Sequence, residues 1–367
     1  MEQNNKVLVS GASFAGLTTA YWMNKMGYEV TVVEIGNDLK MGGTPVDIKD
    51  ETVEIVKRMG LFEQIKAQRI GPEKWEFKNA DDVSEKIVLL DKPLDNEFEI
   101  ERDNLLNMLF DLIKDDVNFI FNNSIASLDE KEYGIQVGFK DGTQNLFELV
   151  FGCDGIHSAV RRIWFGEEAE YAHFLGQYFC IAIANRLLVE EGTYQMYAEP
   201  NKGLALYAYN HKTDIIFTFR PEKEIIYDYR NQEQMKQIVL DHIQGMNWRA
   251  SEMRDELLNS KSFYFDKFCQ IKMPSWTKGR VALVGDAGYC ASPAAGMGGS
   301  LAIIGATALA DAFKKCNGDT KLAFEDYNKD LRPFIEDIHA GAVQMLDKLL
   351  PSTQDEIDRR NKTGFEF

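Results

Sequence analysis

The chain has 367 residues and a formal net charge of −17, from 41 basic and 58 acidic side chains. This length predicts about two domains, with a core large enough to fold without disulfides or metals. The excess of acidic residues argues against binding to nucleic acid or to anionic membrane surfaces, because both are negatively charged.

The cysteine and histidine patterns narrow the class of protein further. The five cysteines are far apart and form no CxxC pair, and the five histidines show no metal-binding spacing. We therefore expect no disulfide framework, no metal site and a reducing, cytoplasmic compartment. The N-terminus has no signal-peptide pattern, and the uncharged stretch 287–310 is interrupted by Pro293 and several glycines, so we expect no transmembrane helix.

The first elements in chain order form a βαβ unit. Residues 6–10 are predicted as a buried strand, 17–26 as a helix that ends before Gly27, and 29–34 as a second strand. The later elements expected are a helix at 52–59, strands between 71 and 100, a helix at 103–114, strands around a hairpin turn at 141–142, a strand-rich segment at 174–220 with runs at 204–209 and 215–219, a helix at 232–243, a strand at 281–284, helices at 300–315 and 333–350, and a frayed C-terminal end.

A glycine turn joins the first strand to the first helix. The run Gly11-Ala12-Ser13-Phe14-Ala15-Gly16 fits G-x-G-x-x-G, except that Ser13 stands at the middle glycine. Such glycines allow a tight turn, close approach of a pyrophosphate to the backbone, and close packing of helix on strand. Glu34, 18 residues after Gly16, is placed to accept hydrogen bonds from a ribose 2′-hydroxyl. The unit predicts a dinucleotide, NAD or FAD rather than NADP.

Two later segments combine a strand, an aspartate and glycines. In the segment 152–162, Asp154 follows a strand that ends at residue 151, and Ser158 is the expected N-cap of the next helix. Asp286 ends the strand in 279–286 and precedes a glycine-rich loop and another helix. The aspartate can hold a sugar-like hydroxyl, the glycines let a flat ligand lie against the backbone, and the helix dipole stabilises negative charge.

These three segments, in this order, resemble the group A flavoprotein monooxygenases, the para-hydroxybenzoate hydroxylase-like family. The runs SWTKGRVALVGDAGYC and GASFAGL are similar to a bacterial branch that includes tetracycline-inactivating monooxygenases. The resemblance covers nearly the whole chain. It implies FAD as cofactor, NAD(P)H and O2 as co-substrates, and oxygen delivery by a flavin C4a-hydroperoxide. We therefore expect no catalytic triad.

The resemblance also implies roles for individual residues. Glu34 would hold the adenosine ribose, Asp47 would lie near the flavin, and Arg102 would contact the central part of the cofactor. Asp154 would lie in the segment linked to FAD and NAD(P)H binding, and Asp286 would hold the ribityl chain. The pyrophosphate would lie against Gly11, Ser13, Phe14, Ala15 and Gly16, and the isoalloxazine ring against Pro293, Gly296, Met297, Gly298 and Gly299.

The predicted fold is α/β, with a Rossmann-type FAD-binding domain, a β-sheet substrate domain and a C-terminal helix. The FAD-binding domain would be discontinuous, and we expect a monomer. The expected bounds are 1–70, 101–165 and 270–332 for the FAD-binding domain, 71–100 and 166–269 for the substrate domain, and 333–367 for the C-terminal helix and tail.

The substrate is less defined. Tyr207 and Tyr209 share one strand face, as do Phe217 and Phe219, and each pair lines either the substrate pocket or the core. An aromatic sheet over a flavin suits an aromatic or multi-ring, polyketide-like substrate, and tetracycline inactivation, hence antibiotic resistance, is one candidate. Two alternatives stay open: a flavin reductase or halogenase of the same fold, and a non-catalytic, flavin-dependent small-molecule binding protein.

Overall fold

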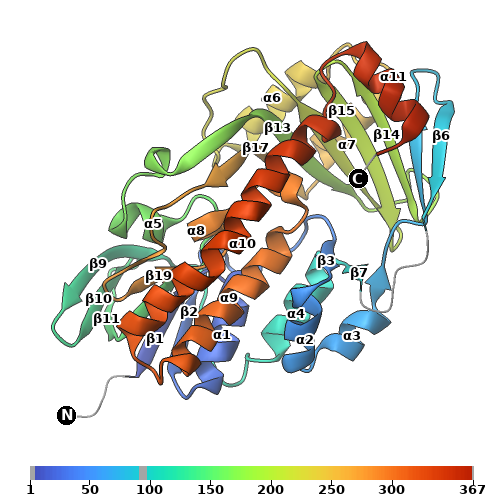
Figure 1. The fold of residues 1–367 in the computed structure, drawn as a ribbon. Helices are drawn as coiled ribbons and strands as arrows, with labels where there is room; N and C mark the ends of the chain where they lie inside the picture. Colours follow the sequence, from blue (N-terminus) through green and yellow to red (C-terminus); the bar gives the residue numbers. More distant parts are fainter. Residues whose placement is uncertain (1–4, 91–96, 366–367) are drawn as a thin grey trace.

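The computed structural model describes residues 5–90 and 97–365, and two large β-sheets form its framework (Figure 1). The first sheet is parallel apart from its edge strand β18. Its central strand β1 is buried on both faces after its first residue, as the hydrophobic run predicts. In spatial order the sheet comprises β18 (Thr277–Lys278), β19 (Val281–Leu283), β12 (Leu149–Gly152), β1 (Lys6–Ser10), β2 (Glu29–Val33) and β8 (Asn118–Ile120).

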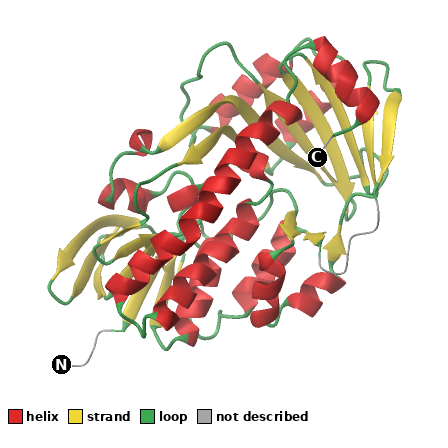
Figure 2. Ribbon diagram, in the orientation of Figure 1, coloured by secondary structure: helices red, strands yellow, loops and turns green. Residues whose placement is uncertain are grey.

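Three helices cover one face of this parallel sheet, as Figure 2 shows. Helix α1 (Phe14–Lys25) packs against α9 (Gly298–Lys315), and α9 packs against α10 (Thr320–Leu349). A small antiparallel sheet flanks the parallel sheet, and it comprises β11 (Gln144–Phe147), β10 (Gly134–Phe139) and β9 (Ile125–Lys131). The expected α/β fold with a Rossmann-type unit is confirmed.

The second large sheet has seven strands and is antiparallel, except that β14 and β5 run parallel. One face packs against α6 (Gln232–Ile243) and α7 (Ala250–Asn259) around a hydrophobic core. In spatial order the sheet comprises β17 (Phe263–Ile271), β13 (Ala172–Ala184), β16 (Lys212–Phe219), β15 (Lys202–Tyr209), β14 (Thr193–Glu199), β5 (Lys74–Lys78) and β6 (Ser84–Leu89). The domain bounds given above stay a prediction.

Short elements fill the region between the two large sheets (Figure 1). A three-stranded sheet places β7 (Phe98–Ile100) between β3 (Val46–Ile48) and β4 (Arg69–Ile70). The remaining elements are α2 (Glu51–Arg58), α3 (Phe62–Ala67), α4 (Arg102–Asp111), α5 (Ala159–Trp164), α8 (Asp286–Tyr289), and the 3-10 turns η1 (Glu168–Glu170) and η2 (Pro293–Ala295). Most predicted helices are present with ends shifted by one to three residues, while α7 was not predicted.

Helix α10 contradicts the prediction of a helix that starts at Pro333. It begins at Thr320, where Asp319 accepts a hydrogen bond from the backbone N–H of Leu322. Pro333 therefore lies inside the helix, which is tolerated because the residue is on the exposed face. With 30 residues the helix is about 45 Å long, and it runs from the parallel sheet to the seven-stranded sheet (Figure 1).

The expectation of a frayed C-terminal end is also wrong for the described residues. Helix α11 (Gln354–Thr363) starts with a capping box formed by Thr353 and Glu356. It packs against β6 and β14, and the Asn361 amide donates to Glu85 at 2.7 Å. The polar sequence of this segment hid the helix, because Ile357 is the one large apolar side chain that it buries.

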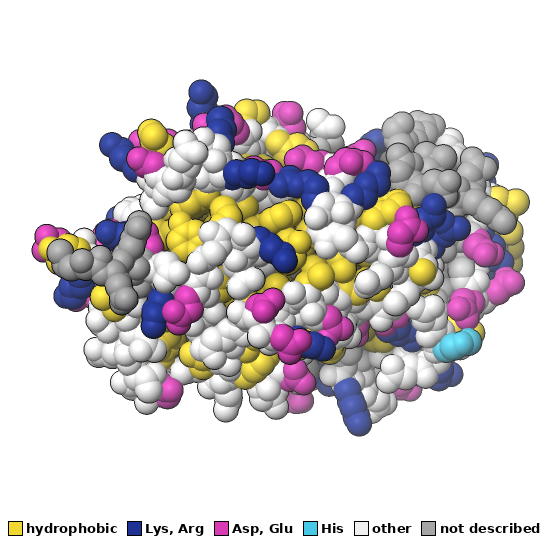
Figure 3. All heavy atoms as spheres, turned by 90° about the horizontal axis from the view of Figure 1, so that it is seen from below, with side chains coloured by type: hydrophobic (Ala, Val, Ile, Leu, Met, Phe, Trp, Pro, Cys, Tyr) yellow, Lys and Arg dark blue, Asp and Glu magenta, His cyan; other side chains and the backbone are white. Residues whose placement is uncertain are grey.

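The surface carries both signs of charge. On the face drawn in Figure 3, acidic and basic side chains are interspersed, and hydrophobic side chains gather in a hollow bordered by Lys and Arg. The net negative charge therefore does not form one continuous patch there. Within the described ranges, none of the helices has the length and apolar character that crossing a membrane requires.

One histidine joins the parallel sheet to the seven-stranded sheet. His157 follows β12, and its Nδ1 lies 3.1 Å from Glu168 while its Nε2 lies 3.4 Å from Asp266 of β17. Its ring stacks on Tyr229 with the centroids 4.0 Å apart. Burial disfavours the charged imidazolium, but the contacts with the Asp266 and Glu168 carboxylates outweigh burial and raise the pKa of His157 to about 9.

We predict that His157 makes stability depend on alkaline pH. Its folded-state pKa lies above the ordinary value of 6.5, so its contribution is complete below that value and is lost as the pH rises through about 9. The difference in free energy of unfolding between wild type and His157→Gln should shrink by about 3 kcal/mol at most over this range. Urea unfolding at several pH values measures it, with the exposed His211→Gln as control; equal pH dependence in wild type and H157Q would contradict the prediction.

We predict that Gly305→Ala destabilises the packing of α9. A Cβ at Gly305 would lie 1.7 Å from the Tyr289 hydroxyl, which cannot retreat because it is buried and hydrogen-bonded to Tyr327. The expected loss is about 1–3 kcal/mol, measured by chemical unfolding. Gly341→Ala in α10 is the matched control: its Cβ meets nothing within 4 Å, so a gain of about 0.5–1 kcal/mol is expected there.

Candidate functional site

In the glycine turn between β1 and α1, positions 11 and 16 have no room for a side chain. Gly11 has φ +103°, and a Cβ there would lie 2.5 Å from the Cys153 carbonyl oxygen. A Cβ at Gly16 would lie 1.8 Å from the Gly11 carbonyl oxygen, so the helix rests directly on the turn. Ser13, the N-cap of α1, makes no side-chain cap, which leaves the N–H groups at the helix start available to an anion.

Glu34 lies where the sequence predicts it, directly after β2. Its Oε2 accepts a 2.8 Å bond from the Ala12 N–H, and its Oε1 accepts a 2.9 Å bond from the Gly36 N–H. The carboxylate therefore fixes the glycine turn to the end of the second strand. A carboxylate has about four acceptor positions, so it can also accept bonds from a ribose.

Arg102, at the start of α4, crosses to the glycine turn. Its guanidinium donates to the carbonyl oxygens of Lys40 and Gly42 at 2.7 and 2.9 Å, and to Ser13 Oγ at 3.2 Å. It also lies 5.2 Å from the centre of the Phe14 ring. Burial lowers the pKa of Arg102, yet arginine stays charged. A positive group therefore stands beside the predicted pyrophosphate position.

The segment after β12 is held by its own hydrogen bonds and by a bond to the segment that follows β19. The carboxylate of Asp154 accepts bonds from Ser158 Oγ and from the N–H groups of Ala159 and Val160 at 2.8 and 3.1 Å, so it caps α5. Arg161 is fully buried and donates to the Ala287 carbonyl oxygen at 2.8 Å. Asp154 thus shapes this segment, while any direct contact with a cofactor stays a prediction.

Asp286 and the glycine-rich loop that follows it lie next to helix α1. A Cβ at Gly285 would lie 3.0 Å from the Ala15 side chain, so Asp286 follows a strand end that touches α1. Burial raises the pKa of Asp286 to about 6. In the loop that follows, Pro293, Gly296 and Gly298 are exposed, and a Cβ at Gly298 would meet nothing within 4 Å.

The predicted flavin loop faces β3. A Cβ at Gly299 would lie 2.6 Å from Val46 and 3.4 Å from the Phe14 ring, and one at Gly296 would lie 3.9 Å from Asp47 Oδ2. The Ser300 hydroxyl donates to the Asp47 carbonyl oxygen at 2.6 Å. The structure therefore brings all three motifs, together with Asp47 and Arg102, into one region. Glycine cradles, free helix N–H groups and a buried arginine fit an adenine dinucleotide with a flat ring system.

The four aromatic residues predicted as substrate contacts divide between the two faces of the seven-stranded sheet. Tyr207 and Tyr209 face the three-stranded sheet, and the Tyr207 hydroxyl donates to Glu99 of β7 at 3.1 Å. Phe217 and Phe219 face the other way and belong to the core with α6 and α7. We therefore assign Phe217 and Phe219 to the core and keep Tyr207 and Tyr209 as candidates, because alternation alone could not tell which face is which.

The tyrosine-bearing face also meets the flavin loop itself. Phe179 and Phe268 of this sheet pack with Ala294 of η2, next to Pro293. Nearby, a Cβ at Gly42 would lie 2.6 Å from Ser262 Oγ. An aromatic sheet face and the predicted ring-binding loop are therefore in contact.

Two residues were not predicted from the sequence. One is Glu99, which accepts a hydrogen bond from Tyr207, and the other is His157. Glu99 stands alone between Phe98 and Ile100, which are both buried. An isolated acid at the outward position of an otherwise apolar strand is the signal that could have identified it.

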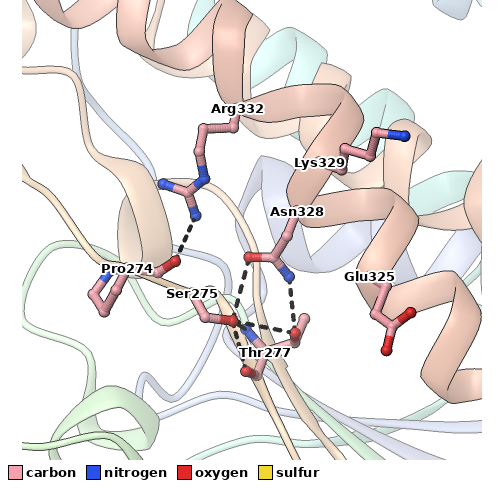
Figure 4. Close-up of a pocket in the computed structure, with 7 residues that line it drawn as sticks. All are labelled: Pro274, Ser275, Thr277, Glu325, Asn328, Lys329 and Arg332. Carbon is pink, nitrogen blue, oxygen red and sulfur yellow. Dashed lines mark hydrogen bonds between the residues drawn. The ribbon is translucent and has the colours of Figure 1, made fainter.

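A separate cavity of about 320 Å³ lies between α10 and the loop before β18 (Figure 4). Asn328 donates to Thr277 Oγ1 at 2.8 Å and accepts from the Trp276 N–H at 2.8 Å, while Arg332 donates to the Pro274 carbonyl oxygen at 3.0 Å. These groups satisfy one another and hold the helix to the loop. None of the predicted site residues lines this cavity.

Comparison with known proteins gives a consistent family. A family model described as FAD binding domain matches residues 4–340. A flavin-dependent monooxygenase of Legionella longbeachae is 34% identical over 346 residues, covering 92% of this chain and 87% of the relative. A flavin-dependent monooxygenase from an unknown prokaryotic organism is 31% identical, covering 98% and 95%.

Solved structures show the same relationship. The tetracycline destructase Tet(51) has a TM-score of 0.88 and 32% identity, covering 98% of this chain and 95% of that one. Klebsiella pneumoniae HpxO complexed with FAD and uric acid, at 18% identity and a TM-score of 0.76 over 97% of this chain and 92% of that one, shares the fold. This chain therefore belongs to the FAD-binding domain family and is an FAD-dependent monooxygenase near the tetracycline-inactivating branch.

Proposed function

We propose that this chain uses NAD(P)H and O2 to hydroxylate a multi-ring, hydroxyl-bearing small molecule, and that tetracyclines are the first substrates to test. One observation carries the proposal: the tyrosine-bearing face of the seven-stranded sheet packs against the loop predicted to hold the flavin ring, through Phe179, Phe268 and Ala294. A flat aromatic substrate would lie between a ring-binding loop and an aromatic wall, an arrangement that favours stacking.

The residues of the chain would bind and orient the cofactor. The pyrophosphate would lie at the start of α1 against Gly11 and Gly16, Glu34 would accept bonds from the ribose, and Arg102 would balance the phosphate charge. Asp286 would hold the ribityl chain. FAD, when bound, supplies the oxygen activation that no side chain can provide. The aromatic wall would exclude water from the reacting atoms.

The comparisons support tetracycline as a substrate but leave it a proposal. Tet(51) and Tet(55) are tetracycline destructases, and they are 32% and 30% identical to this chain with TM-scores of 0.88 and 0.87. If the activity is shared, the chain would confer antibiotic resistance. We also propose a cytoplasmic location, because all five cysteines are free thiols and a reducing compartment keeps them so.

We predict that Arg102→Ala weakens FAD binding. The variant loses bonds to two backbone carbonyls and to Ser13, which together hold the loop 40–42 against the glycine turn. Charge-assisted hydrogen bonds contribute about 1.5–3 kcal/mol each, so a rise in Kd of roughly 10- to 100-fold is expected. Quenching of FAD fluorescence during titration of the apoprotein measures it.

The matched control is Arg58→Ala. Arg58 also makes a bidentate contact, with Asp311 at 2.6 and 2.8 Å, and lies 4.9 Å from the Trp22 ring, but it touches none of the predicted FAD contacts. Its removal should leave the Kd for FAD unchanged. An R102A protein that binds FAD as tightly as wild type would show that the arginine does not support the cofactor.

The proposed reaction predicts oxygen incorporation into the substrate. FAD-loaded protein with tetracycline should oxidise NADH or NADPH faster than without it, and mass spectrometry should detect one atom of label in the product from ¹⁸O₂. A product that gains hydrogen without label would support a reductase, and a chlorinated product a halogenase. Tight tetracycline binding with no turnover would support a non-catalytic binding protein. Failure of a wider aromatic and polyketide panel to stimulate NAD(P)H oxidation would reject the proposed function.

A further inference from the structure

Two carboxyl–tyrosine pairs lie on the face of the seven-stranded sheet that meets the three-stranded sheet. The Tyr207 hydroxyl donates to Glu99 Oε2 at 3.1 Å, and the Tyr209 hydroxyl donates to Asp214 Oδ1 at 2.9 Å. Tyr207 and Asp214 are directly opposite each other on neighbouring strands, so the two pairs are adjacent. Both acids are thereby partnered, as carboxyls in a protein interior usually are.

Glu99 is one strand away from the predicted flavin loop. In the antiparallel pair of β3 and β7, Glu99 is opposite Asp47, so the two side chains share a face. Asp47 Oδ2 lies 3.9 Å from the position of a Cβ at Gly296. Glu99 is partly buried rather than fully enclosed.

The environment of Glu99 favours its protonated form. Burial and the negative charge of Asp47 raise its pKa to about 7, while the bond from Tyr207 and the charge of Lys49 act in the opposite direction. Ile70 of β4 faces it from the other neighbouring strand.

Asp214 shows the same environment in a deeper position. Burial raises its pKa to about 7, with further contributions from Glu101 and Glu99, and Tyr209 and Lys212 oppose the shift. The side chain is fully buried, and within the described ranges its Oδ2 has no hydrogen-bond partner. Glu99 and Asp214 therefore lie close enough for the charge of Glu99 to raise the pKa of Asp214 further.

We propose that Glu99 is the residue that takes a proton from an enol or phenol hydroxyl of the substrate, with Tyr207 as its positioning residue. The inference rests on the proposed function and identifies a chemical feature that its substrate must carry. In the step, the substrate O–H bond breaks, its proton bonds to a carboxylate oxygen of Glu99, and the electron pair stays on the substrate oxygen. No oxidation or reduction is involved.

Removal of the substrate proton would favour hydroxylation. A base is most useful when its proton affinity matches the working pH, as that of Glu99 does near neutrality. An enolate or phenolate is richer in electrons than its neutral form and is therefore a better acceptor of an electrophilic oxygen atom. Tyr207 donates to one carboxylate oxygen of Glu99, so the other oxygen is the one that would accept the proton.

Tetracycline binding to the FAD-loaded protein tests the inference, because tetracycline carries several enol and phenol hydroxyls. The Kd is measured by fluorescence quenching between about pH 6 and about pH 8, in wild type, Glu99→Gln and Tyr207→Phe. Wild-type affinity should rise with pH by up to about tenfold per unit relative to E99Q, since only the carboxylate accepts the proton. Each variant is compared with wild type at the same pH, and therefore with tetracycline in the same ionisation state.

Tyr207→Phe provides a readout that a purely structural role would not give. It removes a bond that lowers the pKa of Glu99, so the midpoint of the pH dependence should move to higher pH. The matched control is the Tyr197–Glu199 pair, also a tyrosine hydroxyl bonded to a glutamate, at 2.9 Å, with the Tyr197 ring in the core on the opposite face. Tyr197→Phe and Glu199→Gln should leave the pH dependence of tetracycline binding as in wild type.

Two results would overturn the inference while leaving the proposed function intact. One is a wild type that binds tetracycline with the same pH dependence as E99Q, and the other is a midpoint in Y207F that does not move. If E99Q fails to retain FAD, the Y207F midpoint alone decides. A wild type that binds no tetracycline at any pH rejects the tetracycline assignment and removes this inference with it.

Discussion

The whole site depends on the contact between two pieces of backbone at the glycine turn. Gly16 approaches the Gly11 carbonyl so closely that a single methyl group would overlap it, and Gly11 in turn lies against the carbonyl oxygen of Cys153. These contacts set the distance between α1, β1 and β12. Because the three predicted cofactor segments follow directly from these elements, any displacement at the turn would separate them.

The second constraint is the joining of a largely parallel sheet to a largely antiparallel one. Helix α10 runs along both, while His157 connects the segment after β12 to Asp266 of β17. The small β3–β7–β4 sheet fills the space between and carries Asp47 toward the flavin loop and Glu99 toward Tyr207. The residue predicted to lie near the cofactor and the residue proposed to contact the substrate thus share one strand pair, which fixes their separation more firmly than loops could.

Much of the fold was predictable because the governing forces are local. The glycine turn, Glu34 and the alternation of strands and helices follow from backbone sterics and hydrophobic periodicity, which a single sequence displays. Pro333 misled the prediction because proline usually ends helices, whereas here it lies on the exposed face, where the kink costs least. Helix α11 was hidden for the opposite reason: its stability comes from a capping box and from Asn361 contacting Glu85, and a polar sequence gives no periodic signal for such contacts.

The substrate side shows where local reasoning ends. Tyr207 and Phe217 occupy equivalent positions in two alternating strands, and each face of such a strand is apolar enough to be core. Only the packing of α6 and α7 makes the Phe217 face the core and leaves the Tyr207 face to meet Glu99. Glu99 itself has an ordinary sequence context, and its raised pKa arises from burial and from Asp47 beside it. The residues predicted to bind a common cofactor are therefore identified by motif, whereas the residue proposed to act on the substrate is identified only once separate elements are brought together.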